Sequence, residues 1–437
     1  MNTLYIVHCI DAEGPMYESI DATFSRLYDV YGFRIDASLS NLKKLQNGQI
    51  DLNGQESAVA TFLSSELLEY NDSWTKIDSM LQDALSPAYR NKVLDDFGSG
   101  WVYSWHCMDH VSLNSNPRRK DIGYGNIFTH YKNILKSTNS IKDEINWHFH
   151  PLSVDRNPLS FAHSYVNNYD ILLGILSRRV IDHEWFPTVN RPGFHSERPD
   201  SHLFLEQWIP FDYANQYYEE NENQLDLAYG RVGDWRRAPS SWCGYNPDIY
   251  DYQSEGSCRR TIFRCLNLGT RHKNLNLSHF HQAFSEARKT GSAILSFVDH
   301  DFRDIRKDVD YFRQMLETVR SEYKDVKIRF TGAESAAINH LGLQEENKLS
   351  LSVKLNKNKL KINVEAGSIF GPQPFLCFKT FEGKYYHDNL DFGLDKKSWT
   401  YIFDNQNIPI NNIQKIGVAS AGLYGGFYVK TLVPSYE

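Results

Sequence analysis

The stretch Thr-Leu-Tyr-Ile-Val-His-Cys-Ile-Asp-Ala-Glu-Gly, residues 3–14, sets the fold class. Its apolar, β-branched run predicts a buried strand, which ends in the acids Asp11 and Glu13 before Gly14 and Pro15 open a loop. A carboxylate inside a buried strand is costly unless it is paired or binds a metal. Side chains two apart on a strand share a face, so Asp11 and Glu13 should point the same way.

A second stretch, Ile-Asn-Trp-His-Phe-His-Pro-Leu at residues 145–152, predicts another strand, stopped by Pro151. The same period of two places His148 and His150 on one face, where two imidazoles can share a metal ion. The alternative is two unrelated histidines, one in the core and one on the surface. The spacing alone does not decide between them.

Strands and helices alternate along the first three quarters of the chain. Strands are expected near 3–11, 101–108, 143–150, 293–298 and 326–330, and helices near 19–29, 57–70, 76–84, 124–137, 167–180 and 304–323. This alternation predicts an α/β fold with a parallel sheet, open or closed into a barrel. Polar residues recur at the carboxyl ends of the strands, where α/β barrels carry their active sites: Asp11/Glu13, Asp109/His110, His148/His150, Arg191 and His300.

Two regions depart from this pattern. Residues 211–260 are rich in Tyr, Asn, Asp, Ser and Gly and are expected to be loop-like, with short strands at best. Residues 345–437 predict a small all-β, sandwich-like domain that begins with a hairpin at 349–364. Further strands are expected near 375–380, 400–403, 414–418 and 426–432. Without a histidine cluster, this domain is expected to carry no chemistry and to cover the barrel.

Composition limits the partners. The chain of 437 residues has a net charge of -7 and no basic block, which argues against nucleic acid and gives no reason to expect an anionic membrane. The six cysteines are scattered with no C-x-x-C pair, as in a reduced protein. The N-terminus does not resemble a signal peptide, and no apolar run is long enough to span a bilayer. A cytoplasmic location is therefore expected.

In chain order, the polar motifs are D-x-E, H-x-H-P, R-P-G, D-W and H-D. This series resembles the NodB-type polysaccharide deacetylases, a carbohydrate esterase family, over roughly residues 1–340. The resemblance is carried by residues 7–14, 147–151, 191–193, 234–235 and 295–301. It implies a distorted (β/α) barrel over residues 1–342, in which the long insertion near 30–100 shapes the substrate cleft.

The resemblance also implies roles for the first three motifs. Glu13, His148 and His150 would bind a divalent metal, most simply Zn²⁺, while Asp11 would be the catalytic base, held by Arg191. One carboxylate and two imidazoles leave a position on zinc for water, whose pKa the metal lowers towards ~7. The family usually has adjacent acids and histidines four apart, so the roles of Asp11 and Glu13 could be exchanged. Arg191 could alternatively be a surface salt-bridge residue.

The remaining motifs imply the proton donor and the substrate contacts. By position, His300 would be the general acid, oriented by Asp234, and Trp235 would line the acetyl pocket. Asp109 could belong to a polar rim of the cleft or to a solvated loop, and His195 could be a metal ligand or a substrate contact. A plainer interpretation of His300 and the following Asp is the cap of the next helix.

These observations favour a metal-dependent deacetylase that acts on an N-acetylated or O-acetylated sugar. Its expected substrate is a surface polysaccharide or its precursor, for example a lipid-linked intermediate of lipopolysaccharide O-antigen. Two alternatives stay open. One is a non-catalytic glycan-binding or assembly protein on the same fold, which would not need Asp11. The other is a metal-dependent glycosidase on a related barrel, which would release a reducing end instead of acetate.

Overall fold

A computed structural model describes residues 1–158, 164–217, 233–269, 274–344 and 347–435 of the protein. Its centre is a parallel sheet in which seven strands close into a barrel, because β1 pairs with both β7 and β2. In barrel order the strands are β1 (Asn2–Ala12), β2 (Tyr103–Cys107), β3 (Glu144–Phe149), β4 (Val189–Pro192), β5 (Phe211–Asn215), β6 (Thr261–Asn267) and β7 (Ser292–His300). An eighth strand, β8 (Val326–Phe330), pairs with β1 outside the ring. The expected α/β barrel is confirmed.

Helices cover the barrel on its outside. They are α5 (Trp74–Ala84), α6 (Pro87–Arg90), α7 (Asn126–Ser137), α8 (Tyr169–His183), α9 (Pro199–Trp208), α10 (Leu277–Thr290) and α11 (Ile305–Arg320). Inside, alternate residues of β1 such as Val7 and Cys9 meet Tyr213 and Cys265 from other strands. The helix α12 (Ala333–His340) contributes three alanines to the same core. Asp11 belongs to this inward series, so the period of two places it in the mouth of the barrel.

Strand β6 was not expected from the sequence. All seven of its residues, Thr-Ile-Phe-Arg-Cys-Leu-Asn, are buried, although the polar members interrupt the apolar pattern. Arg264 is satisfied by the carbonyl oxygens of Tyr217 and Ser240 and by Gln282 Oε1. A buried arginine with this many acceptors is tolerated, and such acceptors come from distant segments that the local sequence does not reveal. Residues 218–232 of the stretch expected to be loop-like lie outside the described residues.

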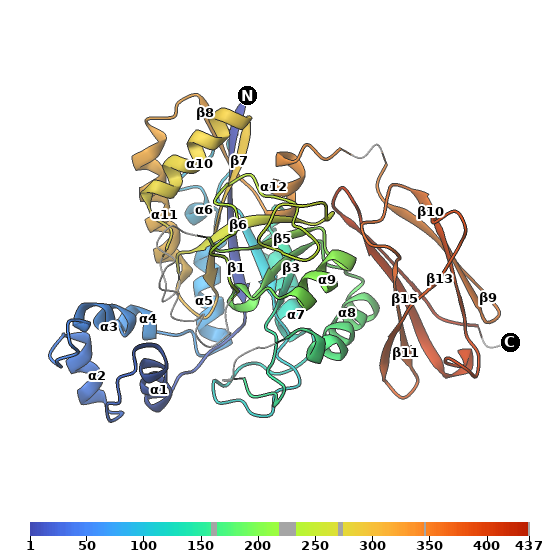
Figure 1. Cartoon of the computed structure of the whole chain (residues 1–437), viewed down its shortest axis with the longest axis horizontal. Coiled ribbons are helices and arrows are strands. Elements are labelled where there is room, and N and C mark those ends of the chain that lie inside the picture. The colour runs from blue at the N-terminus through green and yellow to red at the C-terminus, as the bar shows by residue number, and fades with distance from the viewer. Residues whose placement is uncertain (159–163, 218–232, 270–273, 345–346, 436–437) are drawn as a thin grey trace.

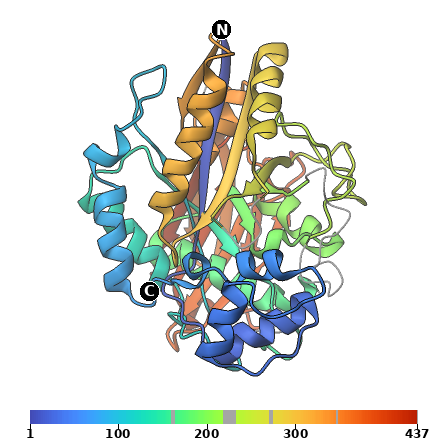
Figure 2. The ribbon, with the colours of Figure 1, turned by 90° about the vertical axis from the view of Figure 1, so that its left-hand side faces the viewer.

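The excursion between β1 and β2 forms a small helical lobe. It contains α1 (Ile20–Tyr31), α2 (Leu39–Gln46), α3 (Glu56–Phe62) and α4 (Ser65–Leu68). Phe24, Leu27, Leu45 and Phe62 form a core of its own. Figures 1 and 2 show the lobe at the end of the barrel towards which β1 runs. The excursion therefore stands beside the carboxyl ends of the strands.

Residues 350–432 form two antiparallel four-stranded sheets, which confirms an all-β unit. One sheet contains β13 (Asp391–Phe392), β14 (Ser398–Ile402), β10 (Lys359–Ala366) and β9 (Ser350–Asn356); the other contains β12 (Tyr385–Asp388), β11 (Phe375–Thr380), β15 (Ile413–Ala421) and β16 (Phe427–Leu432). Leu360, Ile362, Phe378 and Ile416 belong to the core between the sheets. The expected start of this unit at residue 345 lies outside the described residues.

The second of these sheets packs directly on helix α8, as Figure 1 shows. Phe375 and Cys377 join the same hydrophobic core as Leu176 and Val180 of α8. Gly417 permits the close approach, because a Cβ at this position would lie 2.7 Å from Cγ1 of Val180. The all-β unit therefore covers the outer helical layer of the barrel.

Two findings bear on the expected surroundings of the protein. All six cysteines are free thiols. Among the helices in the described part of the chain, none is long and apolar enough to cross a membrane.

Candidate metal centre

Three side chains predicted as metal ligands meet at the carboxyl ends of β1 and β3. One atom from each of Glu13, His148 and His150 lies within 4.8 Å of the other two. The Nε2 atoms of His148 and His150 are 3.0 Å apart, and Oε1 of Glu13 lies 3.3 Å from Nε2 of His150. The structure thus brings a carboxylate together with two imidazoles from a distant part of the sequence. Glu13 and His148 are 135 residues apart.

The backbone fixes how His148 presents its ring. Its Nδ1–H donates to the carbonyl oxygen of Arg191 at 2.5 Å, because β3 and β4 are neighbours with His148 beside Arg191. This bond fixes the neutral tautomer whose Nε2 carries a lone pair, and it aims that lone pair at His150 and Glu13. Metal-binding histidines commonly have such a second hydrogen bond.

The donor set fits a divalent cation. The Nε2 atoms of His148 and His150 face each other at 3.0 Å, and Oε1 of Glu13 lies 3.3 Å from Nε2 of His150. A metal ion would satisfy all three atoms together, and one oxygen with two nitrogens is a donor set that suits zinc. The interpretation of His148 and His150 as unrelated histidines is therefore wrong as to their arrangement, since their side chains converge.

Asp11 lies beside the three candidate ligands and is held by Arg191. Oδ2 of Asp11 is 3.2 Å from Arg191 NH2 and 3.7 Å from Nε2 of His300, and Oδ1 is 3.5 Å from Nδ1 of His148. Arg191 is buried, so the interpretation as a surface salt-bridge residue is wrong. His300 also approaches Oε1 of Glu13, at 3.9 Å. Four of the predicted residues thus form one compact group with the acid Glu13.

Burial determines the charge of these groups. It lowers the pKa of His148 and His300 well below the ordinary value, so both imidazoles are neutral. Burial also raises the pKa of Asp11, and Arg191 offsets only part of this rise. For Glu13, burial raises the pKa, but the nearby Lys120 and His150 lower it by more than burial raises it. The pKa of Glu13 is therefore well below the ordinary value. The pocket therefore combines lone-pair imidazoles with an ionised carboxylate.

A strained turn after β4 supports the site from one side. Phe194 and His195 both have positive φ, 55° and 47°, in a region that non-glycine residues rarely occupy. The ring of Phe194 packs edge-on against His150 with centroids 4.5 Å apart. His195 contacts Arg191 and lies 3.0 Å from Oδ1 of Asn267. Such strain clusters at functional sites, and here it places two rings against a candidate ligand and against the arginine.

Gly193, in the same turn, leaves the space that the ring of His150 occupies. A Cβ there would lie 2.3–2.7 Å from three atoms of that ring. We expect Gly193→Ala to displace His150 and weaken metal binding about 10- to 100-fold, the range found when the support of a ligand is disturbed. Titration with Zn²⁺ monitored by calorimetry measures this. Gly174→Ala, whose Cβ would have no neighbour closer than 3.6 Å, is the control and should bind as the wild type does.

Trp235 and Asp234 have other roles than those implied by the family. Trp235 is completely buried, and its Nε1–H donates to the carbonyl oxygen of His195 at 2.8 Å, so it holds the strained turn and does not line a pocket. The carboxylate of Asp234 accepts two hydrogen bonds from the side chain of Arg236 near the surface. Nδ1 of His300 has no hydrogen-bond partner among the described residues. The expected pairing of Asp234 with His300 is therefore not formed.

Asp109 is also not at a substrate surface. It is buried in an ion pair with Arg179 at 2.7 Å and accepts from the backbone N–H of Gly125. This pair ties the end of β2 to helices α7 and α8. The expected polar rim or solvated loop is wrong for this residue, because Arg179 comes from a distant helix that the sequence did not connect with it.

Two residues that support the site were not given these roles from the sequence. Asp301 accepts hydrogen bonds from the backbone N–H groups of Glu13 and Gly14, both at 2.9 Å, and so shapes the loop that carries the acid. It does not cap α11, since Asp304 does so. Lys120 lies in a loop after β2, and its Nζ is 2.9 Å from Oε2 of Glu13. A strand-end Asp next to His300 was a signal for the first residue. The second ends a polar stretch, residues 114–120, whose sequence fits a cleft rim and a solvated loop about equally.

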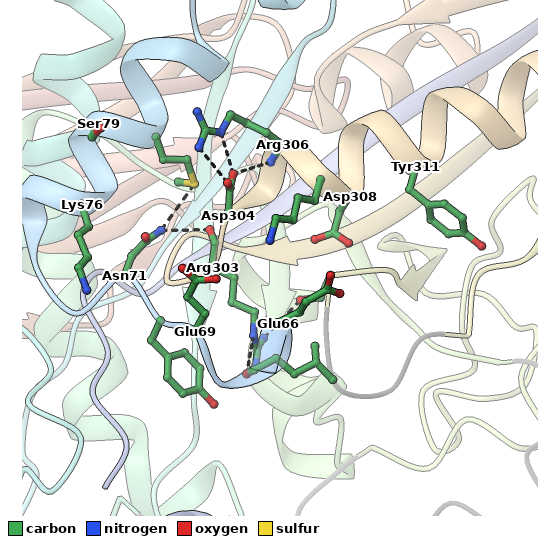
Figure 3. Close-up of a pocket in the computed structure, with 15 residues that line it drawn as sticks. Glu66, Glu69, Asn71, Lys76, Ser79, Arg303, Asp304, Arg306, Asp308 and Tyr311 are labelled. Atoms are coloured by element: carbon green, nitrogen blue, oxygen red, sulfur yellow. Dashed lines mark hydrogen bonds and ion pairs between the residues drawn. The ribbon is translucent and has the colours of Figure 1, made fainter. Parts of the chain in front are cut away.

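A polar cavity of about 680 Å³ is lined by Arg303, shortly after the end of β7, and by none of the candidate metal ligands. Figure 3 shows its lining residues from the 66–71 segment, α5 and the start of α11. Acids and bases both line it, together with Tyr70 and Tyr311. The guanidinium of Arg303 in its wall lies 5.0 Å from the ring centre of Phe302. The rings of Phe302 and His300 have their centres 4.7 Å apart and are tilted by 36°.

The fold and the site define an α/β barrel with a candidate metal centre of one glutamate and two histidines. No protein-family model matches the chain, and no curated protein matches its sequence.

Proposed function

We propose that the protein is a metal-dependent deacetylase of an acetylated sugar. The observation that carries the proposal is the convergence of Glu13, His148 and His150 beside an arginine-held Asp11. A divalent metal bound there would supply an activated water and polarise the acetyl carbonyl. Hydrolysis of an amide or ester also needs a base and an acid close to the reacting atoms, and the pocket offers Asp11 and His300.

The two groups divide the proton transfers between them. Asp11 would take the proton of the attacking water, since burial already raises its pKa and makes it a stronger base. His300 is neutral, so it must gain a proton before it can donate one to the leaving amine or alkoxide. Its Nε2 lies 3.7 Å from Oδ2 of Asp11, which gives a short path for that proton. Arg191 keeps Asp11 pointing at this path.

The substrate class is supported by the polar cavity that Arg303 lines, which Phe302 connects to His300. Its mixture of acids, bases and two tyrosines favours a sugar over an apolar or strongly charged ligand. A volume of about 680 Å³ is large enough for sugar units next to the acetylated one. A surface polysaccharide or one of its precursors is therefore the proposed substrate, and the bond cleaved is an N-acetyl amide or an O-acetyl ester.

The test is acetate release from acetylated oligosaccharides by the metal-loaded protein and by Asp11→Asn. The variant keeps the shape of the side chain but loses the basic oxygen, so we expect a loss of about 10²- to 10⁴-fold in kcat with metal content unchanged. Asp234→Asn is the matched control, because its carboxylate pairs with Arg236 away from the site. Full turnover by Asp11→Asn would rule out this base.

The same assay separates the alternatives. A protein that binds oligosaccharide without releasing acetate, with and without added metal, would be a glycan-binding or assembly protein. New reducing ends without acetate would indicate a glycosidase. The buried acid and base 3.7 Å apart support an enzyme over a binding protein, which has no need for them.

A further inference from the structure

Lys120 is a buried cation placed on a candidate metal ligand. It is 8% exposed, and its Nζ lies 2.9 Å from Oε2 of Glu13 and 4.6 Å from the ring centre of Phe302. The side chain of Asn116 holds the backbone of Lys120. Its Oδ1 accepts from the N–H of Lys120 and its Nδ2 donates to the carbonyl oxygen of Lys120, both at 2.8 Å. The loop therefore delivers the ammonium group to one defined position.

This position is unfavourable for metal affinity. A positive charge next to a carboxylate that binds a divalent cation repels that cation, and in a buried site the repulsion is poorly screened. A site selected for affinity alone would carry a neutral side chain here. The placement of Lys120 thus requires another explanation.

The two oxygens of Glu13 have different partners. Oε2 faces Lys120, whereas Oε1 faces Nε2 of His150 at 3.3 Å. The lysine therefore occupies one oxygen and leaves the other for the point where the histidines converge. A carboxylate with both oxygens free can bind a metal through both, which uses an additional coordination position.

We propose that Lys120 is a positioning residue that makes Glu13 a one-oxygen metal ligand. The proposal rests on the metal centre of the proposed function. Three protein donors then leave open the position at which a hydrolytic metal site must accept water or substrate. Lys120 thus lowers the metal affinity of the site and keeps this coordination position open. It acts through Glu13 and is not itself assigned a role in the chemical step.

The test is titration of the metal-free protein with Co²⁺, whose visible spectrum reports coordination number through its intensity. For Lys120→Met we expect weaker absorption per metal ion, as Glu13 contributes its second oxygen, and binding about tenfold tighter, within the range for changes around a ligand. Lys120→Arg restores the charge and should return both quantities towards the wild type. Lys92→Met is the matched control, because Lys92 pairs with Asp310 at the surface.

The outcomes separate this proposal from the proposed function. A wild-type protein that binds neither Co²⁺ nor Zn²⁺ would overturn the metal centre itself. Metal binding by the wild type with an identical spectrum in Lys120→Met, or with weaker binding in that variant, would overturn only the role of Lys120. If Lys120→Met does not fold, Lys120→Gln removes the charge while keeping a donor to Oε2, and the same tighter binding is expected.

Discussion

His148→Ala is expected to lose bound metal almost completely, to less than about a tenth of the wild-type content, because three donors are too few to spare one. Acetate release should fall with it. The expected loss of metal is larger for His148 than for a ligand at the surface, because His148 is buried and the carbonyl oxygen of Arg191 sets its tautomer. Elemental measurement of the purified, unchelated protein checks the metal content.

The control is His130→Ala. His130 lies on α7, pairs with Asp78 at 2.8 Å and packs on Trp74, away from the site. It should keep its metal and activity. If His148→Ala were well folded and still held as much metal as His130→Ala, the assignment of the three ligands would be wrong.

Arg260→Met should destabilise the fold by about 3–5 kcal/mol, the cost of leaving buried charges without their partner. Arg260 is fully buried and binds Glu197 at 2.7 Å and Asp212 at 2.5 Å, and both carboxylates are also fully buried. The cluster joins β5 and β6 to the loop before α9. Denaturant unfolding measures the change, and Arg288→Met, which breaks an exposed pair with Asp325, should cost less than about 1 kcal/mol.

The loss in Arg260→Met should also depend on pH. Folding raises the pKa of Asp212 from 3.8 to about 8, first through burial and then through Glu197, against the effect of Arg260. A carboxyl whose pKa rises on folding favours the folded state at low pH, and this stability is lost as the pH increases towards that raised pKa. Without Arg260, its lowering effect on the pKa of Asp212 is lost and ionising this carboxyl costs more. The variant should therefore be destabilised more at pH 8 than at pH 5. A loss that is equal at both pH values would contradict this.

The separate motifs were predictable because each is local. Asp11 lies on the inward face of β1 by alternation, and His148 and His150 are two residues apart at the end of β3. Strand β6 was missed, since Arg264 and the other polar residues hide the pattern of a fully buried strand. Helix α10 was also missed. Trp235 and Asp234 were placed in the site by a motif, whereas their contacts lie behind and outside it.

Local sequence patterns are enough to predict the alternation of strands and helices, the all-β character of the last 90 or so residues, and which acids and histidines stand at strand ends. Those properties depend on neighbours within a few positions, which set backbone conformation and the direction of each side chain. Three features appear only in the folded chain: the sheet closes, Glu13 meets the two histidines at the end of β3, and Lys120 contacts the second oxygen of Glu13. These contacts join segments more than 100 residues apart, and their energies depend on burial and charge that no local pattern records.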